Sequence, residues 1–229
     1  MEKKNVFRAD LHMHTHHSKD SLSKPLDILK AAMRKGLHAI AITDHDEIDG
    51  AFEAAKLAKA MRLPLQVIIG EEVATAEGDL LVYFLKKRIA RGNLATVLAE
   101  VKRQGAICCA AHPYDFTRYG IALEKIPAKQ LAAIDAIEAF NARITVRSHN
   151  SDALKFAHSR GKPILAGSDA HHPSEVGAAY VEFSGVKKLD KHSLLSAPRT
   201  LGGKVSPAYV HLFSRYAVAV KKARKVFRR

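Results

Sequence analysis

Histidine, aspartate and glutamate residues gather in short clusters along the chain, and each cluster directly follows a hydrophobic run. The clusters are Asp10-Leu-His12-Met-His14, Thr43-Asp44-His45-Asp46, Gly70-Glu71-Glu72, Ala111-His112-Pro113, Phe140-Asn141 and Gly167-Ser-Asp169-Ala-His171. The hydrophobic runs are typical of buried strands, and β/α barrels keep their chemistry at the face where the strands have their carboxyl ends. The sequence therefore predicts that these side chains converge on a single metal site.

The residue types in the clusters match the ligands of divalent transition metals. His12 and His14 are two positions apart at a strand end, so both imidazoles point to the same side. Asp169 and His171 repeat this spacing, and Glu72 can present one carboxylate oxygen to each of two ions. Further nitrogen donors are His45 and His112. Mixed imidazole and carboxylate ligands suit Zn²⁺, Mn²⁺ or Fe²⁺, and the lack of a cysteine in any cluster argues against a structural thiolate zinc site.

Strand-like and helix-like segments alternate along the chain, which predicts an α/β fold with a mostly parallel sheet. Strands are expected at Val6–Leu11, Ala39–Thr43, Leu65–Ile69, Leu80–Leu85, Ala106–Ala111, Ile134–Phe140, Pro163–Ala166 and Ala179–Phe183. Helices are expected at Pro25–Lys35, Asp49–Met61, Leu94–Gln104, Ala128–Ala133, Arg147–Arg160 and Lys188–Ser196. The chain of 229 residues is long enough for one barrel-sized domain.

Composition places the chain among ordinary globular proteins. Hydrophobic residues make up 47% and charged residues 26%. We find no apolar stretch long enough to span a membrane and no secretory signal, so we expect a cytoplasmic protein. The cysteines Cys108 and Cys109 are neighbours in an apolar strand, where side chains alternate between faces, so a disulfide between them is not expected.

The net charge of +14 is concentrated at the carboxyl end of the chain. Residues 191–229 contain 10 lysine and arginine residues and no acid. After a composition break at 198–207, an apolar stripe with helical spacing is formed by Tyr209, Phe213, Tyr216, Val220, Ala223 and Phe227. We expect residues 1–200 to form the barrel and 201–229 a basic amphipathic helix. This helix packs on the barrel, lies on an anionic membrane or contacts nucleic-acid phosphates.

In this order, the segments quoted above resemble the PHP (polymerase and histidinol phosphatase) family of metal-dependent phosphoesterases, over roughly residues 6–183. The resemblance implies a distorted seven-stranded β/α barrel, (β/α)7, with two or three divalent metal ions at the carboxyl ends of the strands. It assigns the ligands as follows: His12, His14, Glu72 and Asp169 to one ion, Glu72 and His112 to a second, and Asp20, His45 and His171 to a third. At the second ion the family commonly has a further histidine, and this chain has Asp79 at that position, which is the predicted replacement ligand.

The predicted activity is hydrolysis of a phosphomonoester or phosphodiester by water that the ions activate. A small phosphorylated metabolite or nucleotide is the expected substrate. Arg143 and Arg118 are candidates to bind phosphate, because guanidinium matches two phosphate oxygens. Asn141 and His172 are expected to line the site, and Asp44 to orient the ligand that follows it.

Three alternatives stay open. The first is a nuclease acting on oligonucleotide ends, with the basic carboxyl-terminal segment holding the strand. The second is a metal-binding accessory module with little catalytic activity, for which Asp79 is the support. The third is hydrolysis of a non-phosphate ester or amide, because activated water is not selective in itself.

Overall fold

The computed structural model describes residues 6–226. The predicted stripe residue Phe227 and the last two arginines, Arg228 and Arg229, lie outside this range. The strands are β1 (Val6–Asp10), β2 (Ala39–Ile42), β3 (Gln66–Thr75), β4 (Gly78–Tyr83), β5 (Ile107–Ala110), β6 (Ala136–Asn141), β7 (Ile164–Gly167), β8 (Ala179–Ser184) and β9 (Arg199–Gly203). The α-helices are α1 (Pro25–Arg34), α2 (Asp49–Ala60), α3 (Leu94–Gln104), α4 (Ala128–Ala133), α5 (Ser148–Ser159), α6 (Lys191–Ser196) and α7 (His211–Val226). Short 3₁₀ helices are η1 (Phe116–Arg118), η2 (Leu123–Lys125), η3 (Pro173–Glu175) and η4 (Ala208–Val210).

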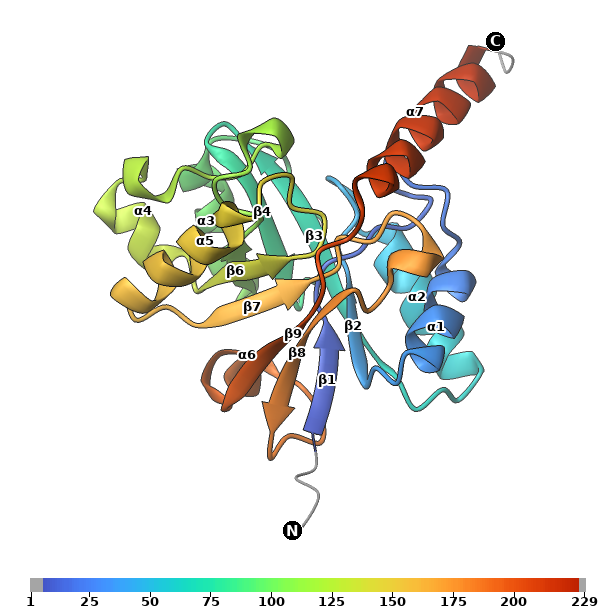
Figure 1. The fold of residues 1–229 in the computed structure, drawn as a ribbon, viewed down its shortest axis with the longest axis horizontal. Coiled ribbons are helices and arrows are strands. Elements are labelled where there is room, and N and C mark those ends of the chain that lie inside the picture. Colours follow the sequence, from blue (N-terminus) through green and yellow to red (C-terminus); the bar gives the residue numbers. More distant parts are fainter. Residues whose placement is uncertain (1–5, 227–229) are drawn as a thin grey trace.

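The strands form one nine-stranded sheet in the order β7-β6-β5-β4-β3-β2-β1-β8-β9 (Figure 1). Parallel pairs join β1 to β2, β2 to β3, β5 to β6 and β6 to β7, whereas β4 is antiparallel to both its neighbours. The loop after β7 returns to the end of β1, where the N–H of Leu11 donates to Ala166 O over 3.3 Å and Met13 forms a parallel bridge with Ala170. These contacts nearly close the sheet into a barrel, which confirms the predicted fold class.

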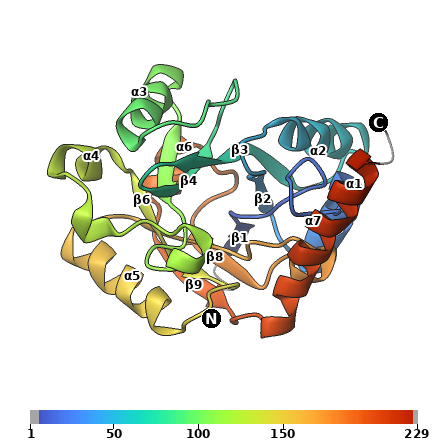
Figure 2. The ribbon, with the colours of Figure 1, turned by 90° about the horizontal axis from the view of Figure 1, so that it is seen from above.

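Helices cover much of the outside of the barrel (Figure 2), and the strands beneath them are buried. Every residue of β2, β4 and β5 is buried, as expected for strands covered on both faces. The α1 helix begins at Pro25, where a fixed φ suits the first turn, and turns Ile28, Leu29 and Ala32 toward the barrel. The α3 helix ends at Gly105, whose φ of 60° is the left-handed conformation that favours glycine.

Two differences from the predicted elements have clear physical reasons. Strand β3 was expected to end at Ile69 but continues to Thr75, because its second half pairs antiparallel with β4. Glu72 therefore lies inside a strand rather than after one. Strand β9 was not predicted, because Gly202 and Gly203 were interpreted as a break. A Cβ atom at Gly202 would lie 2.5 Å from the ring of Tyr180, so glycine here permits close packing of β9 on β8. The division between barrel and extension at residue 200 stays a prediction.

The carboxyl-terminal helix α7 leaves the top of the barrel in Figure 1. Within α7 only Ala217 is buried. Tyr209, just before the helix, and Tyr216 are 60% and 66% exposed. Most of the predicted apolar stripe is therefore not covered by the barrel in the part of the chain that the structure describes.

The cysteines and the helices match what composition predicts. Cys108 and Cys109 are both free and buried in β5. Among residues 6–226, none of the helices combines the length and the apolar character that crossing a bilayer requires.

Candidate metal centre

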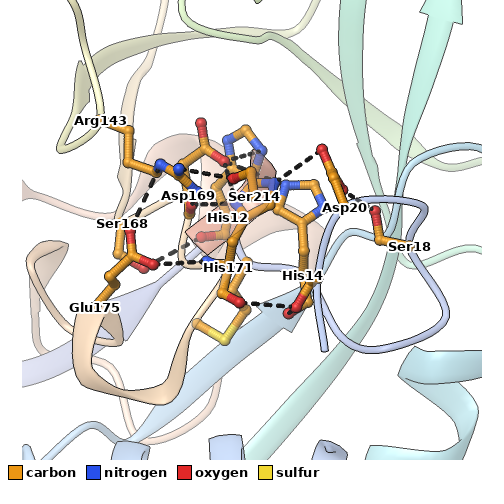
Figure 3. A network of polar contacts seen from close by, with 12 residues as sticks. His12, His14, Ser18, Asp20, Arg143, Ser168, Asp169, His171, Glu175 and Ser214 are labelled. Carbon is orange, nitrogen blue, oxygen red and sulfur yellow. Dashed lines mark hydrogen bonds and ion pairs between the residues drawn. The ribbon is translucent and has the colours of Figure 1, made fainter. Parts of the chain in front are cut away.

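The predicted ligands meet at the carboxyl end of the barrel. They are His12 and His14 after β1, Asp20 in the loop before α1, His45 after β2, Glu72 in β3, Asp79 in β4, His112 after β5, and Asp169 and His171 after β7. Figure 3 shows that the side chains of His12 and His14, after β1, and of Asp169 and His171, after β7, face a common centre. The convergence follows from the fold, since neighbouring strand ends of a barrel lie side by side.

Glu72 is at the middle of the cluster and contacts four imidazoles. Its Oε2 lies 3.2 Å from His12 Nε2, 3.3 Å from His14 Nε2 and 3.2 Å from His45 Nδ1. Its Oε1 lies 3.0 Å from His112 Nε2. Although burial opposes it, the imidazoles of His45 and His12 hold the pKa of Glu72 well below its usual range. An anionic carboxylate with each oxygen aimed at different imidazoles has the arrangement that a bridge between two ions needs.

The ligand atoms fall into small groups whose members all lie within 4.8 Å of one another. The groups are His12, His14 and Asp169; His12, Glu72 and His112; His14, Asp20, His45 and His171; and His45, Glu72 and Asp79. The first three groups bring together the residues that the family resemblance assigns to three separate ions. Asp79 departs from that assignment, because the structure groups it with His45 rather than with His112.

Several buried ring nitrogens in the cluster lack hydrogen-bond partners among residues 6–226. His14 is fully buried, and neither of its nitrogens forms a hydrogen bond. Its Nε2 lies 3.3 Å from oxygens of Glu72 and Asp169, but neither contact has hydrogen-bond geometry. Burial lowers the pKa of His14 to about 3, so the ring is neutral and keeps a free electron pair. An unpaired buried polar group costs about 1–3 kcal/mol, which ligation of a metal ion would offset. The donor set therefore fits a divalent cation.

The backbone at two predicted ligands adopts the left-handed conformation. His112 has a φ of 25° and Asp169 a φ of 54°, values that are unusual outside glycine. Such backbone strain concentrates at functional sites.

A glycine two residues before Asp169 allows β7 to approach the end of β1, because a Cβ atom at Gly167 would lie 2.2 Å from the Cβ of His12. Close approach of β7 to the end of β1 thus depends on Gly167.

Glu138 in β6 orients ligands from behind and was missed in the sequence. Its Oε1 lies 3.0 Å from His12 Nδ1, and its Oε2 accepts hydrogen bonds from the N–H of His112 and from Asn141 Nδ2. Such a carboxylate partner fixes the tautomer and orientation of a ligating histidine. The one signal in the sequence is an acid inside an apolar strand, Ala136–Asn141, where Glu138 is 1% exposed.

Asp79 lies in β4 on the wall of the cluster. Burial, followed by the nearby negative charge of Glu72, raises its pKa to about 7. A cation between these two carboxylates would relieve their repulsion. The position therefore suits a metal ligand. In the metal-free protein, a neutral histidine there would avoid the cost of a buried negative charge beside Glu72.

Asp44 lies behind the ligands and does not face the cluster. Its two carboxylate oxygens accept hydrogen bonds from the N–H and hydroxyl of Thr15 over 2.5 and 2.6 Å. Its backbone carbonyl accepts from the N–H of Glu72 over 3.1 Å. Asp44 thus joins the loops after β1 and β2. Its carboxylate is engaged by Thr15 rather than directed into the cleft.

Arg118 and Asn141 directly contact Asp169, which is a predicted ligand. One Arg118 Nη atom donates to Asp169 Oδ2 and the other donates to Asn141 Oδ1 over 3.2 Å. Asn141 Nδ2 donates to the same oxygen of Asp169 over 3.2 Å. These residues hold the carboxylate, and the 18% exposed side chain of Arg118 also lines the cleft.

Arg143 lines the same cleft as the predicted ligands, but its contacts and those of His172 are not predicted from the sequence. Arg143 is 2% exposed, and its guanidinium donates to backbone or hydroxyl oxygens and faces the Glu175 carboxylate at 3.5 Å. Its charge is thus largely committed inside the protein. His172 is exposed, and its ring stacks on Phe213 of α7 with centroids 4.6 Å apart. Neither spacing nor residue type in the sequence reveals these directions.

The cluster opens into a cleft of about 530 Å³. Its walls carry the cationic side chains of Lys19, Arg91, Arg118, Arg143 and Arg215 beside the carboxylates of Asp20, Glu72, Asp79 and Asp169. A larger open groove of about 1380 Å³ lies elsewhere, around Phe7, His38, Gln66, Leu189 and Lys191, and none of the predicted ligands lines it. The convergent side chains identify the smaller cleft as the site.

Fold and cluster together define an α/β-barrel protein with metal-ligand side chains at the carboxyl ends of its strands. A sequence model of the PHP domain matches residues 10–162, and a model described as PHP-associated matches residues 147–199. The chain belongs to the PHP family.

Similar proteins include two from Methanocaldococcus jannaschii. Uncharacterized protein MJ0417 is 34% identical over 184 residues, which are 77% of this chain and 70% of that protein. Uncharacterized protein MJ1587 is 38% identical over 118 residues, 47% of this chain and 68% of that protein. A solved two-domain protein from Bacteroides vulgatus, described as containing a predicted PHP-like metal-dependent phosphoesterase, has a TM-score of 0.67 at 19% identity. This match covers 85% of the present chain and 62% of the two-domain protein, and it shows the shared fold.

Proposed function

We propose that the protein is a metal-dependent hydrolase that cleaves a phosphomonoester or phosphodiester in a small phosphorylated metabolite or nucleotide. The observation that carries the proposal is the set of four imidazoles, from three different segments, that surround Glu72 at 3.0–3.3 Å. Membership of the PHP family and the fold shared with the Bacteroides vulgatus protein support the same reaction class.

The chain's own residues would hold two or three ions, which we propose to be Mn²⁺, Zn²⁺ or Fe²⁺. The proposed ligands are His12, His14, Glu72 and Asp169 for one ion, Glu72 and His112 for a second, and Asp20, His45 and His171 for a third. We propose Asp79 as a further ligand beside Glu72 and His45. When bound, such ions supply Lewis acidity and activate water toward phosphorus. Glu138 and Asn141 keep the ligands in their orientations through the contacts described above.

Arg118 is the residue we propose to bind the phosphate. Its guanidinium lines the cleft and is held in place by Asp115 and Asp169. A planar guanidinium can donate two parallel hydrogen bonds to phosphate oxygens and stabilise charge that shifts onto them. For Arg143 and Asp44 we propose positioning roles, and for His172 a role in docking α7.

The size of the cleft supports a small substrate. Its volume of about 530 Å³ lies within the range of about 300–1,000 Å³ that is usual for small-molecule sites. Metal-bearing walls with Lys19, Arg91 and Arg215 favour an anionic compound. We also propose a reducing, cytoplasmic setting, which the free cysteines Cys108 and Cys109 support.

A nuclease acting on oligonucleotide ends is the alternative, with α7 as the strand-binding surface. Exposed cations on α7 support it; they are Arg215, Lys222, Arg224 and Lys225. The same cations would also suit an anionic membrane surface. Phosphate-backbone contacts make binding fall steeply with ionic strength, whereas turnover of a small substrate is much less sensitive.

The test is a screen of phosphorylated metabolites, nucleotides and short oligonucleotides with protein loaded with Mn²⁺, Zn²⁺ or Fe²⁺. Released phosphate and cleavage products are measured at low and high salt. We expect turnover of a small phosphate ester that His12→Ala abolishes, while His158→Ala, an exposed histidine on α5, leaves it unchanged. Stoichiometric metal without hydrolysis of any phosphate ester would instead support the accessory-module alternative.

A further inference from the structure

Hydrogen bonds in both halves of helix α7 hold it against the rim of the candidate metal site. Its first half is held by Arg143, which comes from the loop after β6. Its second half is held by Lys221, which reaches the loop between β1 and α1. Seen from above, α7 lies across the side of the barrel that carries α1 (Figure 2). The helix therefore connects the loop between β1 and α1 to the loop after β6, which are far apart in the sequence.

The Arg143 attachment brings α7 to the cleft wall. Arg143 Nη2 donates to Val210 O over 3.0 Å and to Ser214 Oγ over 2.8 Å, while its Nη1 lies 3.4 Å from the backbone carbonyl of Asp169 (Figure 3). As a result His211, Ser214 and Arg215 line the same cleft as the predicted ligands. The carboxyl-terminal helix is thus part of the wall of the candidate site.

The Lys221 attachment acts on a loop that carries a predicted ligand. Lys221 Nζ donates to His16 O over 2.6 Å and also to Ser18 O. Ser18 Oγ in turn donates to Asp20 Oδ1 over 2.8 Å. The other oxygen, Asp20 Oδ2, faces the ligand histidines at 3.2–3.3 Å (Figure 3).

The loop has little regular structure of its own and is held by contacts at both ends, Thr15 to Asp44 and the hydroxyls of Ser21 and Ser23 to the carbonyl of His171. Lys221 holds the part between these contacts. Residues 11–24 between β1 and α1 contain no helix and only an isolated bridge residue. An ammonium group with three donors can hold two backbone carbonyls at once. Without it, the segment His16–Ser18 would be less constrained, and Asp20 would meet its histidines less often.

We propose that Lys221 is a positioning residue for the ion site made by Asp20, His45 and His171, which makes α7 a structural part of the metal centre. This inference rests on the proposed metal chemistry. The basic carboxyl-terminal helix would then help to position a metal ligand of the same chain. Neither the apolar stripe nor the excess of basic residues in the sequence distinguishes Lys221 from the lysines and arginines around it.

The experiment compares Lys221→Met with Lys221→Arg and with Lys222→Met in the full chain. Lys222 is the adjacent exposed lysine, and it donates no hydrogen bond to residues 6–226. Each protein is equilibrated with Mn²⁺ against a competing chelator, and bound manganese per chain is measured together with the melting temperature of the metal-free form. Loss of a residue that orients a ligand costs about 10- to 100-fold in metal affinity. We expect that loss for one ion in Lys221→Met, near-normal binding in Lys221→Arg, and wild-type binding in Lys222→Met.

A Lys221→Met protein that binds as many ions as the wild type, with the same affinities, would overturn the inference. So would a variant that melts earlier but keeps its ion content, because that result shows a purely structural role. Activity is a separate readout. If the wild type binds ions but hydrolyses no phosphate ester, the proposed function fails, and the manganese content of the variants still decides the role of Lys221.

Discussion

Glu138 and His12 face each other inside the barrel, with Glu138 Oε1 3.0 Å from His12 Nδ1. Both side chains are buried, at 1% and 0% exposure. Their contact leaves the Nε2 atom of His12 directed at Glu72 and Asp169, at 3.2 and 3.7 Å. A carboxylate on one imidazole nitrogen thus determines which nitrogen is free for an ion.

The first prediction concerns this pair. Glu138→Gln removes the negative charge but keeps the shape, so His12 loses the partner that fixes its tautomer. We expect metal affinity to fall about 10- to 100-fold. Glu100→Gln, on the surface of α3, is the matched control and should bind metal like the wild type. Chelator competition measures both, and equal affinities in the two variants would show that Glu138 does not orient a ligand.

Metal binding should release protons near neutral pH. Although burial opposes it, Glu72 and Asp20 raise the pKa of His45 to about 9 in the metal-free protein, and burial raises that of Asp79 to about 7. Both groups hold protons at pH 7 that an ion must displace, so the apparent affinity for Mn²⁺ should rise between about pH 6.5 and 9.

Titration calorimetry in buffers of different ionisation enthalpy counts the protons released. We expect a positive number at pH 7 that decreases as the pH rises past 9, where His45 loses its proton. His12 adds to this number, because Asp169 and Glu138 raise its pKa well above the usual value although burial opposes them. An affinity that does not change across this window would contradict the assignment of His45 and Asp79 as ligands.

Asp79 provides a test of the departure from the family pattern. Asp79→His should keep or raise occupancy of the site near Glu72, because a neutral imidazole avoids the cost of burying a negative charge and the repulsion from Glu72, which together raise the pKa of the aspartate. Asp79→Ala should lower that occupancy. Manganese content per chain distinguishes the variants, and complete loss of the ion in Asp79→His would show that Asp79 does not take the place of the family histidine.

Arg118 and Arg143 should respond differently to substitution by methionine. Arg143→Met leaves Glu175 without its partner in a buried pair, which costs about 3–5 kcal/mol of folding stability. Arg118→Met also removes a partner of Asp115 and Asp169, but Asp115 keeps its hydrogen bonds from Thr117 and Thr145, and Asp169 keeps the one from Asn141. We therefore expect a folded protein whose kcat/KM is lower by about 10- to 100-fold, the loss expected for hydrogen bonds to a charged group. Denaturant unfolding and steady-state kinetics measure the two effects. A large kinetic defect with normal stability in Arg143→Met would reverse our placement of these residues.

The sequence predicts how most of the proposed ligands come together, because they follow strands whose hydrophobic runs are visible. Asp20 lies instead in a loop, and Glu72 and Asp79 lie inside strands. His12 and His14 show this most simply, since a spacing of two places both on one side of the chain. His112 and Asp169 come together because the barrel closes. The order of the motifs along the chain is what makes the sequence resemble the PHP family.

What the sequence does not predict depends on tertiary contacts. Glu138 is one acid in an apolar strand, and only the neighbouring strands show that it supports His12 and His112. Arg143 has the residue type of a phosphate ligand, but its direction depends on Glu175 and α7. Strand β9 was missed because its glycines, which fit against Tyr180, are also typical of a break in structure.

The central claim is that these imidazoles and carboxylates hold divalent ions around Glu72. The most direct measurement is a crystal structure of the protein soaked in Mn²⁺, with anomalous maps that locate manganese. We expect ion peaks on both sides of the Glu72 carboxylate, one beside His12, His14 and Asp169 and another beside His112. Ordered side chains that point apart, with no peak among them, would contradict the claim.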